Sequence, residues 1–181
     1  MASKVHALAG RRTRAYLWDC LSYLGLAVCT VPLGVVINRL GRGGDRRLAL
    51  AVSALPPVAA TLIASVGEAG PRRSTIGKRR EQLAVVNESG QPLSMPRALV
   101  RNAVKIGIPW QLGHVVAIGA AFDGFRRRDP LTVGTAVLTY PLLAAMVITG
   151  VHTGRALHDR AAHSQVISTR VAGAARLDRR T

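Results

Sequence analysis

A carboxylate lies inside the first long apolar run of the chain, at Asp19. A stripe of residues at intervals of four and three shares one face of the expected helix, and it consists of Arg12, Tyr16, Asp19, Tyr23, Leu26 and Thr30. An acidic group within a membrane helix can bind a cation or a proton, but it is costly to expose to lipid. We therefore expect this face to lie against other helices or water. There, Asp19 could serve as an ion or proton site or, alternatively, as part of an ion pair that holds the helices together.

Other groups with chemical potential give weaker signals. His114 lies near Gln111 in a moderately apolar run and could relay protons, although a hydrogen-bonded packing histidine is commoner. Histidines and an aspartate gather within 152–163, but three ligands on one helix face are not evident, so no metal site is expected. Thr75-Ile-Gly-Lys78 lacks the second glycine of a phosphate-binding loop and is interpreted as a basic turn at a membrane surface. No arrangement of nucleophile and base indicates an enzyme, and no cofactor is expected.

Composition points to a membrane protein. The chain has 181 residues, of which 49% are hydrophobic, and a formal net charge of +16. In a soluble protein this charge would suggest nucleic acid. Here the charges cluster between long apolar runs, which is typical of a small multi-pass membrane protein with basic loops. We therefore expect the lipid bilayer, including anionic headgroups that meet the basic loops, as a partner, and no nucleic acid.

Four apolar runs are long enough to be transmembrane helices, at about 16–37, 48–66, 103–122 and 131–151. A proline pair near the centre of the second run is expected to kink it. The third run carries Lys105 and is more polar, so a count of three spans stays open. The expected fold class is an all-α membrane bundle of about four transmembrane helices.

The loops predict the orientation of these spans. With four spans, the N-terminal region, the segment 67–105 and the tail share one side and hold 18 Lys and Arg, against seven on the other side. The positive-inside rule then places both termini in the cytosol. The expected location is the cell membrane, with a basic cytosolic N-terminus at 1–15 and a basic disordered tail at 168–181.

The segment 67–102 is the only sizeable piece between predicted spans. It is expected to form a small cytosolic β-hairpin-like flap, in which a strand at 82–87 turns at 88–90 and returns through 91–93. Ser94 is expected to cap a following helix. On that helix Arg97, Arg101 and Lys105 share a face and could meet lipid phosphates or buried acids.

Several motifs, taken together and in order, resemble the RDD-domain family of multi-pass membrane proteins, which is named for one arginine and two aspartates. The resemblance covers about 11–167, and it places an RDD-like membrane domain at 16–167. The residues that carry it are Arg12 and Asp19 at a spacing of seven, Thr75-Ile-Gly77-Lys78, Ala84-Val-Val86, Gly90, Arg101-Asn102 and Gly154-Arg-Ala-Leu157-His-Asp159-Arg160.

The resemblance implies transport of a small solute or ion, with cation–proton exchange proposed for some family members. The alternative is a non-catalytic accessory or scaffold subunit of a larger membrane complex, with a protein partner or a second copy of the chain. In either case, the expected charge network or ion site consists of Arg12, Asp19, Arg101 and Asp159. Arg12 could pair with Asp19 or with Asp159.

Overall fold

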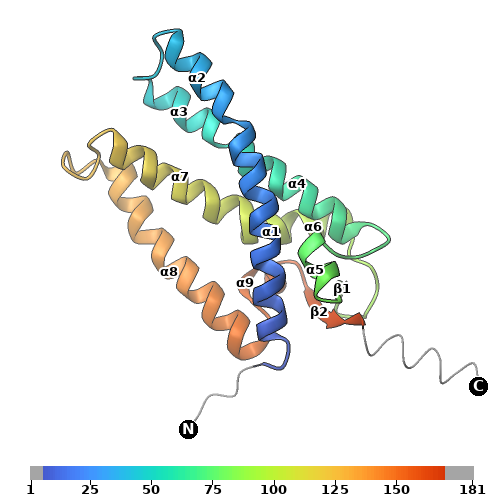
Figure 1. The fold of residues 1–181 in the computed structure, drawn as a ribbon. Coiled ribbons are helices and arrows are strands. Elements are labelled where there is room, and N and C mark those ends of the chain that lie inside the picture. Colours follow the sequence, from blue (N-terminus) through green and yellow to red (C-terminus); the bar gives the residue numbers. More distant parts are fainter. Residues whose placement is uncertain (1–5, 170–181) are drawn as a thin grey trace, which may run out of the picture.

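The computed structural model describes residues 6–169 and is mostly helical, as predicted (Figure 1). Two parts of the chain lie outside the described residues. They are the start of the predicted N-terminal region, at 1–5, and most of the predicted tail, at 170–181. The elements in chain order are α1 Ala9–Cys29, α2 Val31–Arg39, α3 Arg46–Ser53, α4 Leu55–Ala69, α5 Ile76–Arg80, β1 Leu83–Asn87, α6 Met95–Asn102, the π-helix η1 Ala103–Gly107, α7 Ile108–Ala121, α8 Pro130–Thr153, α9 Leu157–Ala161 and β2 Ser164–Ser168.

Three helical segments of the described chain are long and apolar enough to cross a membrane: Ala9–Arg39, Arg46–Ala69 and Pro130–Thr153. The first begins at Ala9, earlier than the predicted start at residue 16. The second is interrupted at Ala54, because Pro56 and Pro57 occupy the first turn of α4 and supply no N–H donors. Many large apolar side chains on these segments are exposed, as expected for helices that face lipid.

The predicted run at 103–122 folds as η1 and α7, and it does not meet the same criteria for a spanning helix. Its path is nevertheless constrained at both ends. The segment α6–η1–α7 starts beside the end of α4, whereas α8 starts beside α3, where Arg46 donates a 2.6 Å hydrogen bond to Asp129. This segment therefore carries the chain from one end of the bundle to the other, and Figure 1 shows α8 returning from the loop that follows α7.

The small sheet is confirmed, but its second strand is not the predicted one. β1 pairs antiparallel with β2, in a register that runs from Leu83 opposite Ser168 to Asn87 opposite Ser164. The predicted return strand at 91–93 makes only an isolated bridge, between Val86 and Pro92. Proline has no N–H to donate to a ladder, so this segment cannot continue the pairing.

The short elements gather at one end of the bundle, here called the sheet end, which holds α5, β1, α6, α9 and β2 (Figure 1). Fully buried Val85 packs with Leu93 and Ala98 beneath the sheet. Ser94 precedes α6 as predicted, but its side chain makes no capping hydrogen bond. The core between α1, α4 and η1 is built from Tyr23 and small residues of α4, so these backbones approach closely.

Candidate functional site: a buried ion network

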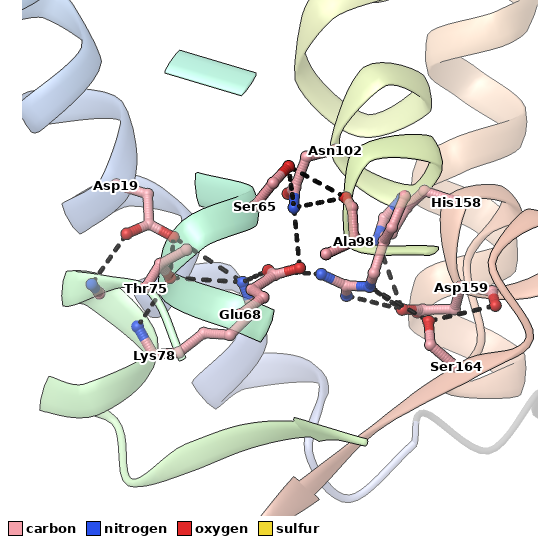
Figure 2. Close-up of polar contacts among 12 residues, drawn as sticks. Asp19, Ser65, Glu68, Thr75, Lys78, Ala98, Asn102, His158, Asp159 and Ser164 are labelled. Carbon is pink, nitrogen blue, oxygen red and sulfur yellow. Dashed lines mark hydrogen bonds and ion pairs between the residues drawn. The ribbon is translucent and has the colours of Figure 1, made fainter. Parts of the chain in front are cut away.

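A glutamate that the sequence analysis did not single out lies at the centre of the sheet end. Glu68, near the end of α4, is completely buried. Its Oε1 accepts hydrogen bonds from Lys78 Nζ at 2.8 Å and from Arg101 Nη1 at 2.6 Å. Its Oε2 accepts one from Asn102 Nδ2 at 2.9 Å. One carboxylate therefore binds two buried cations and a buried amide (Figure 2).

Asp19 lies on the α1 side of this centre, and it too is buried. It accepts hydrogen bonds from the Thr75 hydroxyl at 2.7 Å and from the Gly77 amide at 2.8 Å. The Lys78 ammonium is 4.0 Å away. Asp19 thus holds the first turn of α5 against α1. The predicted burial of the polar face of α1 is confirmed at this residue.

Thr75-Ile-Gly-Lys78 was interpreted as a basic turn at a membrane surface, but Gly77 and Lys78 are buried. Thr75 caps α5, and the two buried residues lie against α1. A Cβ atom at Gly77 would overlap the carbonyl oxygen of Ala15 and lie 2.9 Å from Asp19 Oδ1. Glycine is therefore required for this close approach of two backbones.

Asp159 forms the other side of the network. Its Oδ1 accepts hydrogen bonds from Arg101 Nη2 at 2.7 Å and Nε at 3.1 Å. Its Oδ2 accepts a hydrogen bond from Arg12 and a second one, at 3.1 Å, from the backbone amide of Ala156. Ala156 lies at the start of α9. Of the two partners considered for Arg12, the structure selects Asp159. Arg12 also donates to the carbonyl of Gly154.

Burial and charge act in opposite directions on this side. Burial alone would raise the pKa of Asp159, but the nearby positive charges, of which Arg101 has the largest effect and Arg12 adds a hydrogen bond, together hold the pKa well below its usual range. Burial alone would lower the pKa of Arg101, but Glu68 and Asp159 raise it above its usual value. Both groups are therefore ionised throughout the physiological range.

The contacts form one continuous chain of alternating charge, here called the buried ion network. It joins α1, α4, α5, α6 and α9, which are far apart in sequence. Of the predicted residues, Arg12 and Arg101 each pair with Asp159. Within the described residues, Asp19 joins them through Lys78 and Glu68. In order, the members are Asp19, Lys78, Glu68, Arg101, Asp159 and Arg12.

Two histidines have contrasting environments. His158 is buried beside Asp159, with its Nε2 3.8 Å from Oδ1. Burial, followed by the charge of Arg101, lowers the pKa of His158 well below its usual value. His114 lies apart from the network, between α3 and α7. It accepts a 3.0 Å hydrogen bond from the Trp110 indole, so its other nitrogen donates to the carbonyl of Ser53 at 2.7 Å.

That geometry is one of a packing histidine, and a proton relay through His114 stays a prediction. Among residues 6–169, no three histidine, cysteine, aspartate or glutamate side chains are grouped to hold a metal ion. The predicted basic face of α6 is divided, because Arg97 is exposed whereas Arg101 and Lys105 are buried.

Sequence reasoning missed Glu68, Lys78 and the amide of Asn102. Glu68 lies two residues beyond the predicted end of the second apolar run, where an acid usually belongs to a solvated loop. The sequence offered one signal for a buried acid at this place. Arg101 and Asn102 are adjacent donors, a cation and an amide, and both bind Glu68 in the structure.

Comparison with known proteins agrees with this architecture. The sequence model of the RDD family matches residues 6–163, a range that contains every member of the buried ion network. No significant match was found among curated proteins or solved structures. The match extends over most of the chain, and the chain belongs to the RDD family.

Proposed function

We propose that this RDD-family chain acts as a non-catalytic accessory or scaffold subunit in the cell membrane, with its sheet end in the cytosol. The observation that carries the proposal is the pairing of all three buried acids of the network. Asp19, Glu68 and Asp159 each accept two or more hydrogen bonds and have a cation within 4.0 Å. A carboxylate that exchanges ions must break its hydrogen bonds and ion pairs in every transport cycle. In a scaffold protein these bonds stay in place.

In this proposal the network fixes a rigid platform to the ends of the spans. The platform consists of α5, β1, α6, α9 and β2. Its exposed arginines include Arg79, Arg80 and Arg97, and Arg72 is exposed in the loop before α5. A basic surface of this kind suits an acidic partner protein or anionic headgroups.

The proposed topology has four crossings and cytosolic termini. Its support is the path of the chain: α1 begins and α8 ends at the same end of the bundle, where the His6 amide donates a 3.0 Å hydrogen bond to the carbonyl of Val151. With three apolar crossings, the segment α6–η1–α7 must supply a fourth for this contact to form. The side with the larger number of Lys and Arg then lies in the cytosol.

Transport is the second candidate, and one observation favours it. Asp19 lines a cavity of about 750 Å³ between α1 and α4, with Tyr23, Ile63 and Ser74 among the other lining residues. An acid at the wall of a cavity can meet a cation or proton if Lys78 withdraws. In this candidate function the chain would exchange a small cation for protons.

The variant Asp19→Asn separates the two functions. The purified full chain is reconstituted in vesicles that contain a pH-sensitive dye, and proton movement is followed after a sodium or potassium pulse. As a scaffold, the wild type moves no more protons than empty vesicles, and Asp19→Asn lowers the amount of folded protein in the membrane. Wild-type flux that is lost in a folded Asp19→Asn protein would instead establish transport.

A further inference from the structure

A second pocket, of about 330 Å³, lies between α1 and α8 at the sheet end. Four cations line it, and the described residues around it include no acid. The acids that pair with Arg12, Lys78 and Arg101 approach these cations from outside the pocket lining. The fourth cation is Lys105 of η1. Because the other three cations are paired with carboxylates, the positive charge left for a ligand of the pocket is that of Lys105.

Lys105 is the unbalanced member of this group. It is only 7% exposed, and among residues 6–169 no carboxylate lies within 4.0 Å of its ammonium group. Its nearest aromatic contact is the Tyr16 ring, whose centroid is 5.2 Å from the ammonium. An aromatic face attracts a cation but does not neutralise its charge. Burial of an uncompensated charge is costly, so a bound anion would relieve this position.

The opposite wall of the pocket is apolar and belongs to a candidate membrane span. Leu143, Met146 and Val147 of α8 line it, and Leu143 and Val147 are also exposed on the surface of that helix. Ligand pockets commonly have volumes of about 300–1,000 Å³, so this one accommodates a compact head group and the first part of a chain. The ligand must then be anionic at one end and apolar at the other.

We propose that this pocket binds an anionic phospholipid, with its phosphate at Lys105 and the start of an acyl chain along α8. The location supports a lipid over a soluble phosphate compound, because the apolar wall is continuous with the lipid-facing surface of α8. This buried site is distinct from the expected attraction between anionic headgroups and the exposed basic loops. It is compatible with either a scaffold or a transporter.

The test measures binding of three probes to the full-length protein in a neutral detergent, by native mass spectrometry and by the shift in unfolding temperature. The probes are short-chain phosphatidylglycerol, phosphatidylcholine with the same chains, and glycerol phosphate. The variant is Lys105→Gln, and the matched control is Arg127→Gln, an exposed cation in the loop between α7 and α8 at the other end of the bundle. Loss of one charge-assisted contact should weaken phosphatidylglycerol binding about tenfold or more.

We expect wild type and Arg127→Gln to bind phosphatidylglycerol in preference to both other probes, and Lys105→Gln to lose this preference. Equal binding of phosphatidylcholine, or unchanged affinity in Lys105→Gln, would overturn the site. Glycerol phosphate binding as tightly as phosphatidylglycerol would show that the anion is a soluble one and overturn the lipid assignment. Lys105→Gln removes an uncompensated buried charge, so its unfolding temperature without probe should equal or exceed that of the wild type, which shows that it is folded.

Discussion

The central position of Glu68 makes Glu68→Gln the most informative perturbation of this protein. The substitution keeps the shape of the side chain and removes its charge. Lys78 and Arg101, which are 5% and 1% exposed, then lose their shared counterion. Removal of one partner from a buried ion pair costs about 3–5 kcal/mol, because the remaining charge stays buried without compensation. Since two cations depend on Glu68, we expect a loss of unfolding free energy in the upper part of this range.

The matched control is Glu88→Gln, the same chemical change at an exposed ion pair with Arg155. Exposed pairs contribute about 0–1 kcal/mol, so this variant should unfold almost as the wild type does. The assay is equilibrium unfolding in mixed micelles, in which the fraction of sodium dodecyl sulfate is raised and helicity is followed by circular dichroism. A loss in Glu68→Gln no larger than that in Glu88→Gln would refute the reasoning.

A double substitution tests whether charge balance, rather than shape, is responsible. Glu68→Gln combined with Lys78→Met removes one charge of each sign from the network. The two residues are in direct contact, so their effects should not add, and an interaction energy of about 0.5–3 kcal/mol is expected. Strict additivity would mean that the Lys78–Glu68 bond has no energetic consequence.

Two further predictions concern pH and packing. The folded-state pKa of His158 is lowered, so below about pH 6.5 the unfolded chain binds the proton first and the unfolding free energy falls by up to about 1.4 kcal/mol per pH unit. His158→Asn should make unfolding less pH-dependent between pH 7.5 and 5.5, and an unchanged slope would contradict the assignment. Gly77→Ala should cost at least about 1–3 kcal/mol, because its Cβ meets the α1 backbone. In the control Gly113→Ala, no atom lies within 4 Å of the added Cβ, so the unfolding free energy should stay the same or rise by up to about 1 kcal/mol. Equal losses of unfolding free energy in the two variants would exclude the close approach of Gly77 to α1.

The sequence was sufficient for those features that depend on local pattern. Three of the four apolar runs correspond to helical segments long and apolar enough to cross a membrane, and an acid within the first run identified Asp19 as buried. The register of β1 was not accessible in this way, because its partner β2 lies far along the chain, after α6, η1, α7, α8 and α9. A strand with several possible partners is assigned by tertiary packing, which local turn signals do not report.

Charge partners were harder to predict for a related reason. Lys78 and Arg79 are neighbours in one basic stretch, yet the first is buried at Glu68 and the second is exposed. The difference arises because α5 is fixed by Asp19 at its first turn, which directs one side chain of the stretch inward. Without the contact between α1 and α5, the sequence offers no reason to separate the two residues.

The distribution of buried charge along the bundle bears on the choice between scaffold and transporter. Within residues 6–169, every charged side chain classed as buried belongs to the ion network or, as Lys105, to the adjoining pocket. At the opposite end, α2 and α3 contain no buried residue, and the Arg46–Asp129 pair is partly exposed. A pathway for ions requires polar groups that can hold a charge at successive depths of the membrane. Buried charge that is confined to one end instead secures the short elements to the spans, and this distribution favours a scaffold whose rigid part is the sheet end.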